Sequence, residues 1–484
     1  MKPKYSFAAG LPLCVDMDGT LVRTDTFIEL VVALLKRNPL YLGALGWWLC
    51  KGRAYCKHQV ATRVALSVKH LPYNTDLLTY LRQQHATRRP LFLTTASSVV
   101  VAQQVARHLG IFTGVVASSA TLNFKGSHKA QALVKKFGER KFAYAGNAPS
   151  DLAVWAKAGE GIVVSSNPWL ITRARQATYV TSIFGNRSKR VTRWLQALRW
   201  HQWPKNILIF VPLMAAHKVT ELTLVYNALL AFLAFCLASS SVYILNDLLD
   251  LEADRRHHRK RYRPFAAGTL SLSIGFFAVP LLLLASFGVS TLLPASFVWL
   301  LTLYLGLTLL YSFLLKQIIL VDVFLLAVLY TIRLYAGAAA TLVLVSSWLT
   351  AFGMFLFLSL AVVKRFSELK HLEATASNAH GRGYTVSDSI PLAQIGIASG
   401  YLAAVILALY ISSEEIYSLY QTPILLWLLV PLQLYWISRI WFLAHRGVLE
   451  DDPLIFAMRD TVSYLVAACA MLVVLGASYY YGAA

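Results

Sequence analysis

The sequence predicts two folds in one chain: a Rossmann-type α/β domain over residues 1–185 and an all-α membrane domain over residues 206–484. Of the 484 residues, 57% are hydrophobic and 14% are charged, which is too apolar for a soluble protein of this length. The apolar residues are also unevenly spread. The first part has mixed polarity, and the second consists of long apolar runs separated by short polar loops.

The α/β prediction depends on four short apolar runs that are typical of buried parallel strands. They lie at residues 11–15, 90–94, 142–145 and 161–164. Helical stretches separate them, and an alternation of strands and helices predicts a doubly wound sheet.

A basic linker, residues 186–205, joins the two folds. It interleaves arginine and lysine with Trp194, Trp200 and Trp203. A basic segment with tryptophans before an apolar run is typical of an anchor at the cytoplasmic face of a membrane.

The second fold is predicted to contain about nine membrane-spanning helices. They are expected near residues 206–217, 224–245, 270–290, 293–315, 321–342, 346–364, 389–411, 423–443 and 462–481. Loops that follow the even-numbered helices carry most of the arginine and lysine. The positive-inside rule therefore places the α/β domain and these loops in the cytoplasm of an inner or plasma membrane, with the C-terminus on the opposite side.

The net charge of +22 does not indicate nucleic-acid binding, because the cations lie in short segments between apolar runs. The five cysteines are scattered without metal-ligand spacing, which fits a reducing compartment. Oligomeric state leaves no signal in the sequence.

One acidic motif follows the second predicted helix. Asp247, Asp250 and Asp254 are spaced so that one helical face would carry all three carboxylates. Such a cluster suits a Mg²⁺ ion that holds a diphosphate. The segment 255–263 then supplies cations for phosphate oxygens.

Asn246 to Asp254, followed by Arg263 and the segment 264–268, resembles the first aspartate-rich motif of the UbiA-type intramembrane prenyltransferases. The resemblance covers residues 190–484. It implies a central cavity in which Mg²⁺ on Asp247, Asp250 and Asp254 binds the diphosphate of an activated donor. Typical members carry a second aspartate-rich motif after the sixth helix and transfer a prenyl group to an aromatic acceptor.

This chain departs from that pattern after its sixth predicted helix, where bases stand in place of the second acidic motif. The residues concerned are Lys364, Arg365, Glu368, Arg382 and Tyr384. This variant is similar to the decaprenyl-phosphate phosphoribosyltransferase branch of the superfamily. That branch implies 5-phosphoribosyl 1-pyrophosphate as donor and a polyprenyl phosphate as acceptor.

The resemblance implies that Mg²⁺ stabilises the pyrophosphate leaving group while the lipid phosphate attacks C1 of ribose. It also implies a set of residues that bind the substrates: Asn246, Lys260, Arg263, Lys364, Arg365, Glu368, Arg382 and Tyr384. Two alternatives stay open. One is a conventional prenyltransferase that uses a prenyl diphosphate, and the other is a set of helices that only anchors the first domain.

In the first domain, Asp16 and Asp18 follow a predicted strand and resemble motif I of the haloacid dehalogenase-like (HAD) phosphohydrolases. There the first aspartate is the nucleophile and the second a general acid/base. Thr95 matches the phosphate-binding hydroxyl of motif II, and Lys129 matches the lysine of motif III.

Residues 146–151 match motif IV of the same family, which implies that Asp16, Asp18, Asn147 and Asp151 hold a Mg²⁺ ion. Asn147 stands where the family usually has an aspartate, so weaker metal binding is expected. Two interpretations follow: a phosphatase that removes the 5-phosphate of the ribosyl lipid, or a domain that folds and serves to regulate or dock.

Overall fold

The computed structural model describes residues 10–38, 40–118, 124, 126–185, 190–375, 383–449 and 452–479. The chain divides into two compact units. The first contains Met1–Leu198 together with Tyr243–Val279, and the second contains Arg199–Val242 together with Pro280–Ala484. The segment with the aspartate motif thus belongs to the same unit as the N-terminal α/β domain.

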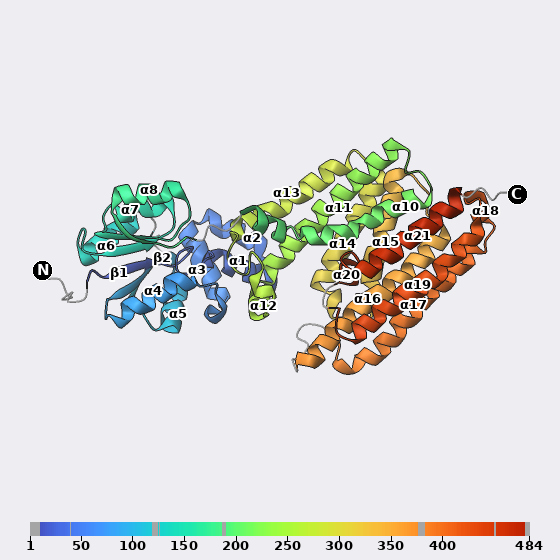
Figure 1. The fold of residues 1–484 in the computed structure, drawn as a ribbon. Helices are drawn as coiled ribbons and strands as arrows, with labels where there is room; N and C mark the ends of the chain where they lie inside the picture. Colours follow the sequence, from blue (N-terminus) through green and yellow to red (C-terminus); the bar gives the residue numbers. More distant parts are fainter. Residues whose placement is uncertain are drawn as a thin grey trace. The chain divides into compact units, whose positions relative to one another are not determined.

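The first unit is built on a six-stranded parallel sheet with strand order β3-β2-β1-β4-β5-β6 (Figure 1). Its strands are β1 (Leu13–Asp16), β2 (Leu91–Ser98), β3 (Gly114–Ser118), β4 (Ala143–Gly146), β5 (Glu160–Val163) and β6 (Tyr179–Ile183). Its helices are α1 (Thr26–Arg37), α2 (Tyr41–Cys50), α3 (Arg53–Arg63), α4 (Thr75–Ala86), α5 (Val99–Leu109), α6 (Ser127–Phe137), α7 (Leu152–Trp155), α8 (Pro168–Ala177), α9 (Arg190–Ala197) and α12 (Leu251–Arg256).

The predicted parallel α/β sheet is confirmed, and all four predicted strands are present within two residues of their expected starts. The prediction missed two strands. The two missed strands, β3 and β6, lie at the two edges of the sheet. The apolar run of β3 is limited to residues 115–117, and β6 has alternating exposed positions. An edge strand does not need the long apolar run that marks a strand buried on both faces.

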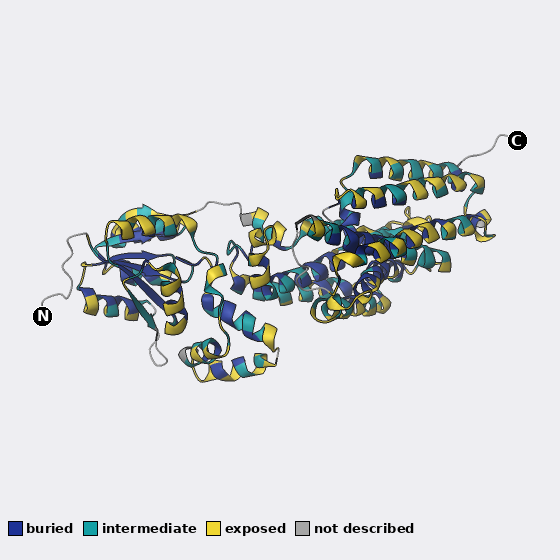
Figure 2. Ribbon diagram, turned by 90° about the horizontal axis from the view of Figure 1, so that it is seen from below, coloured by how far each residue is buried: buried dark blue, intermediate teal, exposed yellow. Residues whose placement is uncertain are grey.

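Helices cover both faces of the sheet, because alternate residues of a strand point in opposite directions. In β1, Leu13 and Val15 pack with α1, α4 and α5, whereas Cys14 packs with α6, α7 and α8. Figure 2 shows the strands as the most deeply buried part of this unit. The polar side chains are therefore left to the carboxyl edge, where the strands end.

The second unit is helical. Its elements are the 3-10 helix η3 (Trp200–Phe210), α10 (Val211–Ala215), α11 (Leu222–Leu249), α13 (Leu272–Ser290), α14 (Ala295–Phe313), α15 (Val321–Thr341), α16 (Ser347–Thr375), α17 (Ser389–Ile411), α18 (Glu415–Leu419), α19 (Leu429–His445), α20 (Pro453–Ala457) and α21 (Thr461–Tyr479). The last residues of α11 and the first of α13 belong to the first unit.

Eight helices in the described part of the chain are long and apolar enough to cross a membrane, one fewer than predicted. The missing span is the first, residues 206–217, which forms the end of η3 and the short α10. Its apolar residues are divided between η3 and a five-residue α-helix that begins at Val211, with Pro212 in its first turn, so no α-helix here reaches the length of a span. The sidedness of the membrane domain stays a prediction.

η3 packs tightly on α15. A Cβ at Gly337 would lie 1.9 Å from the carbonyl oxygen of Ile209, so only glycine permits this approach. Arg333, one turn earlier, donates from Nε to Oδ1 of Asn206 at 2.9 Å and from Nη2 to the Tyr304 hydroxyl at 3.1 Å. These contacts fix η3 against the bundle.

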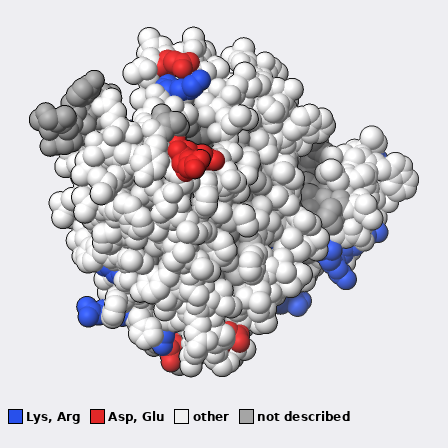
Figure 3. All heavy atoms as spheres, turned by 90° about the vertical axis from the view of Figure 1, so that its right-hand side faces the viewer, with Lys and Arg blue, Asp and Glu red and all other residues white. Residues whose placement is uncertain are grey.

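The outward surface of the helical unit is apolar. Figure 3 shows one face on which lysine, arginine, aspartate and glutamate are few and lie toward the upper and lower edges. Several large side chains are exposed on these helices, among them Phe277, Trp299 and Leu472. A wide uncharged surface is what helices in contact with lipid require.

Candidate functional site

The aspartate motif is broken between two helices. Asp247 lies in the last turn of α11, which ends at Leu249, and Asp254 lies in α12. Asp250 is the residue between them and precedes the first turn of α12. The expectation that one continuous helix presents all three carboxylates is therefore wrong, because the helix axis changes at Asp250.

Two of the three carboxylates converge on one cation. Nη1 of Arg263 lies 3.2 Å from Oδ1 of Asp247 and 2.7 Å from Oδ2 of Asp254. Asp250 instead contacts Nζ of Lys36 at 2.9 Å. The predicted substrate residue Arg263 thus stands where Asp247 and Asp254 offer oxygen atoms to a positive charge.

Burial raises the pKa of Asp254 above its usual value, although the charges of Arg263 and Lys260 oppose the shift. Asp247 is buried as well, whereas Lys260 is exposed and Asn246 is half-buried. Paired carboxylates that share one cation are a donor set that suits a hard ion such as Mg²⁺. Asp247 and Asp254 are the residues that would hold it, and Asp250 would have to leave Lys36 to join them.

A second charged cluster lies inside the helical unit, and it has the opposite composition. Oδ2 of Asp452 lies 2.6 Å from Nζ of Lys205 and 3.1 Å from Nζ of Lys364. The Tyr330 hydroxyl donates to the same carboxylate at 3.1 Å. The carboxylate side chain is 5% exposed. Two lysines and a tyrosine hydroxyl therefore surround one buried anion.

The two lysines of this cluster determine the protonation state of Asp452. Burial alone would raise the pKa of Asp452, but Lys205 and Lys364 outweigh it and hold the pKa well below its usual range. Asp452 is therefore ionised at neutral pH. The three ionised side chains together leave one positive charge in excess.

Other predicted bases belong to a separate network. Nε of Arg365 lies 2.7 Å from Oδ2 of Asp322, and the Tyr384 hydroxyl donates to Oδ1 of Asp322 at 2.5 Å. Arg365 also pairs with Glu368 and is almost fully buried. This network joins α15, α16 and the segment before α17. Arg382 lies outside the described residues.

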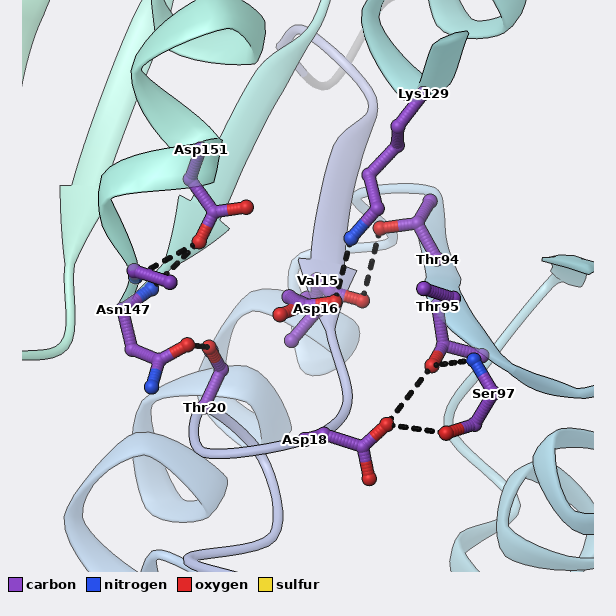
Figure 4. Close-up of polar contacts among 12 residues, drawn as sticks. Val15, Asp16, Asp18, Thr20, Thr94, Thr95, Ser97, Lys129, Asn147 and Asp151 are labelled. Carbon is purple, nitrogen blue, oxygen red and sulfur yellow. Dashed lines mark hydrogen bonds and ion pairs between the residues drawn. The ribbon is translucent and has the colours of Figure 1, made fainter. Parts of the chain in front are cut away.

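The predicted residues of the α/β domain do meet at the carboxyl edge of β1, β2 and β4 (Figure 4). Lys129 donates from Nζ to Oδ1 of Asp16 at 2.6 Å and to the Tyr144 hydroxyl at 3.0 Å. Asp151 accepts from the Tyr144 hydroxyl at 2.9 Å and from the backbone N–H of Asn147 at 3.0 Å.

Asp18 points away from this group. Its Oδ2 accepts from the hydroxyls of Ser97 at 2.5 Å and Thr95 at 3.3 Å, and its Oδ1 accepts from the hydroxyl and backbone N–H of Thr26 at 2.7 and 2.9 Å. Asn147 accepts from the Thr20 hydroxyl at 3.1 Å. Figure 4 shows Asp16, Asp18 and Asp151 directed to different partners.

Burial raises the pKa of Asp16 to about 7, although the charge of Lys129 opposes it. Burial by itself would lower the pKa of Lys129, but Asp16 and Asp151 outweigh it and raise the pKa. Within the described ranges, no three His, Cys, Asp or Glu side chains form a group able to hold a metal ion. The oxygens of Asp16, Asp18 and Asp151 do not converge as those of Asp247 and Asp254 do, so this arrangement does not fit a metal ion.

Comparison with known proteins assigns the helical part to a family. The model of the UbiA prenyltransferase family matches residues 207–459, which is more than half of the chain. The chain belongs to the UbiA prenyltransferase family. With eight apolar helices of membrane-spanning length among the described residues, it is a multi-pass membrane protein of the UbiA transferase type.

Three known proteins are similar to this UbiA protein over different shares of its length. An uncharacterised protein, y4nM, of Sinorhizobium fredii is 36% identical over 96% of this chain and 90% of its own length. The nodulation protein NoeC of Azorhizobium caulinodans is 37% identical over 55% of this chain and 86% of its own. A decaprenyl-phosphate phosphoribosyltransferase of Mycolicibacterium smegmatis is 35% identical over 38% of this chain and 59% of its own. The similarity to the Sinorhizobium protein therefore includes the α/β region.

Several residues of the cluster around Asp452 were not predicted as site residues from the sequence of this UbiA protein. Lys205 was assigned to a surface anchor, yet it is buried beside Asp452. Asp452 carried a partial signal, because it ends a run of three acids, residues 450–452, directly before Pro453. Tyr330 carried none, since a tyrosine in an apolar helix does not reveal its partner.

Proposed function

We propose that this UbiA protein transfers a phosphoribosyl group from phosphoribosyl pyrophosphate to a polyprenyl phosphate. The observation that carries the proposal is the cluster in which Lys205 and Lys364 pair with Asp452, called the lysine cluster below. Its Lys364 stands at the end of the sixth predicted helix, so the chain offers a phosphate-binding cation near the place where a second metal-binding motif would be expected. The similarity to a decaprenyl-phosphate phosphoribosyltransferase supports this substrate class.

In this proposal Asp247 and Asp254 bind Mg²⁺, which supplies charge neutralisation for the departing pyrophosphate. The two carboxylates already share one cation, Arg263. When a metal ion takes the place between them, the guanidinium becomes a partner for pyrophosphate oxygens. Arginine suits this task because its fork can contact two oxygens at once.

Lys205 and Lys364 bind a substrate phosphate. Asp452 now occupies the position between them that a phosphate oxygen would take, and Tyr330 donates to the same point. A charge-assisted contact of this kind is worth about 1.5–3 kcal/mol. The acceptor phosphate is ionised at neutral pH, so it attacks C1 of ribose without a strong general base.

The test is incubation of the purified full-length protein with Mg²⁺, polyprenyl phosphate and ribose-labelled phosphoribosyl pyrophosphate. Label should appear in the lipid fraction. Transfer from a prenyl diphosphate to an aromatic acceptor, with no labelled lipid from the first incubation, would instead establish the conventional prenyltransferase reaction. If neither reaction occurs, the membrane helices serve another purpose such as anchoring.

We also propose that the α/β domain is a HAD-like phosphohydrolase that acts on the 5-phosphate of the ribosyl lipid. The support is the meeting of Asp16, Thr95, Lys129 and Asp151 at the carboxyl edge of the sheet, the usual site in open α/β folds. Asp16 would attack phosphorus, and Lys129 would hold a phosphate oxygen.

Two variants test this second reaction. Asp16→Asn should abolish phosphate release and leave lipid labelling unchanged. Lys129→Met should likewise abolish phosphate release, because the substrate phosphate would lose the cation that now pairs with Asp16. If wild type and Asp16→Asn release phosphate equally, the domain folds without this activity.

A further inference from the structure

The short helix α12, which carries Asp254 of the aspartate motif, is bound to helix α1 of the same unit. Arg255 of α12 forms two parallel hydrogen bonds with Glu29 of α1: Nη1 to Oε2 at 2.8 Å and Nη2 to Oε1 at 2.7 Å. The two side chains are 8% and 3% exposed. This fork-to-carboxylate geometry is the most directional form of ion pair that proteins use.

Both partners of this pair have further contacts. The Thr24 hydroxyl donates to Glu29, and Nε of Arg255 donates to the carbonyl oxygen of Ala266 at 3.0 Å. Glu29 is thus held in place by Thr24, a neighbour in the same domain. Arg255 in turn joins α12 to the segment that carries Ala266.

These two segments carry the groups that face each other in the motif. Asp254 directly precedes Arg255, and Arg263 lies three residues before Ala266. A shift of Arg255 would therefore move the Asp254 carboxylate and the Arg263 guanidinium relative to Asp247. The 2.7 Å contact between Asp254 and Arg263 depends on this alignment.

A second set of contacts holds the same surface. Lys36 lies two turns after Glu29 on the same face of α1 and pairs with Asp250. Gly268 has φ +65°, and a Cβ there would lie 2.7 Å from Cβ of Arg23. The motif segment therefore approaches the residues around α1 closely, and its position depends on them.

We propose that Glu29 is a positioning residue for the membrane transferase. Acting through Arg255, it holds Asp254 and Arg263 so that the carboxylates of Asp247 and Asp254 converge on one cation. The inference rests on the proposed function of this motif as a metal–diphosphate site. It makes the α/β domain a structural part of the transferase, whether or not that domain hydrolyses phosphate.

The test measures Mn²⁺ binding to the full-length protein in detergent by electron paramagnetic resonance, with no substrate present. Asp254→Asn identifies the signal that belongs to the motif. Glu29→Gln, which removes the charge and keeps the shape, should weaken that signal about 10- to 100-fold, the usual effect of losing a group that orients a ligand. Glu29→Asp should restore part of the affinity.

Glu252→Gln is the matched control. Glu252 lies on α12 itself and pairs with Arg256, but both side chains are more than half exposed. This variant should bind Mn²⁺ as wild type does. If Glu29→Gln fails to fold, Arg255→Lys takes its place, because lysine keeps the charge but cannot form the fork.

Wild-type Mn²⁺ affinity in folded Glu29→Gln or Arg255→Lys protein would overturn the inference. Absence of any Asp254-dependent signal in wild type would overturn it too. A different result is expected if phosphoribosyl pyrophosphate is not the donor. The wild type would then bind Mn²⁺ more tightly than Glu29→Gln does, but no label would be transferred from phosphoribosyl pyrophosphate.

Discussion

The aspartate motif and the lysine cluster are opposite in charge but alike in construction. In the motif, the acids Asp247 and Asp254 share one base, Arg263. In the cluster, the bases Lys205 and Lys364 share one acid, Asp452. The motif is left with one negative charge in excess, and the cluster is left with one positive charge in excess. Both lie in largely buried positions. Such an excess is costly unless a ligand of opposite charge is bound, so each cluster is suited to a different charge of ligand.

This difference suits the two groups to two separate tasks. The motif is suited to a metal ion, and the cluster is suited to phosphate oxygens. A reaction in which both substrates carry phosphates needs both tasks. The predictions below test whether the two groups differ in this way.

The largest effect is expected for Asp254→Asn. The variant loses the carboxylate that completes the cation site, and a metal ion contributes several kcal/mol to the stabilisation of a leaving group. Transfer should fall about a thousandfold. Initial rates of lipid labelling measure the loss, and Asp16→Asn serves as the control. A rate close to wild type would show that the motif does not hold the metal.

Asp452→Asn should destabilise the helical unit by about 3–5 kcal/mol, because the buried Lys205 and the partly exposed Lys364 lose the carboxylate they share. Lys205→Met should cost less, since Lys364 still pairs with Asp452. Thermal unfolding of the detergent-solubilised protein measures both variants. The reverse order of stabilities would mean that the lysines do not depend on Asp452.

Lys205→Met should also raise the KM for one phosphate-bearing substrate about tenfold or more, because one charge-assisted contact is lost. The value of kcat should change less. Steady-state kinetics with each substrate varied in turn identify which phosphate Lys205 binds. Unchanged KM values for both substrates would remove Lys205 from the binding site.

Gly337→Ala is expected to cost about 1–3 kcal/mol, the usual effect of overpacking. The new Cβ would displace Ile209, and with it η3, the element that carries Lys205. Thermal unfolding gives the cost. Gly306→Ala is the control, because a Cβ there meets no atom within 4 Å.

The smallest effect is expected in the pH dependence of stability, at the ion pair between Asp16 and Lys129. Because burial raises the pKa of Asp16 to about 7, its contribution to stability is present at low pH and is lost as the pH rises through 7. The slope is at most about 1.4 kcal/mol per pH unit. Thermal unfolding from pH 5 to 8 should show a shallower decline for Asp16→Asn. Equal slopes would place the pKa of Asp16 outside this range.

Much of the fold was predictable because its signals are local. Apolar runs of strand or membrane-helix length appear directly in the sequence, and eight of the nine predicted spans are present. The ninth prediction, residues 206–217, was wrong because that segment is divided between η3 and the five-residue α10, and neither has the length of a span. The break at Asp250 was equally hidden, since helical spacing continues through a residue at which the helix itself ends.

The sequence by itself determined the class of each part, the location of the aspartate motif and the presence of Lys364 and Arg365 at the end of the sixth predicted helix. Only the tertiary structure decided which charges pair. Lys205 and Asp452 are 247 residues apart, and Glu29 and Arg255 are 226 apart. Local patterns carry no information about such partners, because a buried charge is stabilised by whichever opposite charge the packing of the helices brings within hydrogen-bond distance.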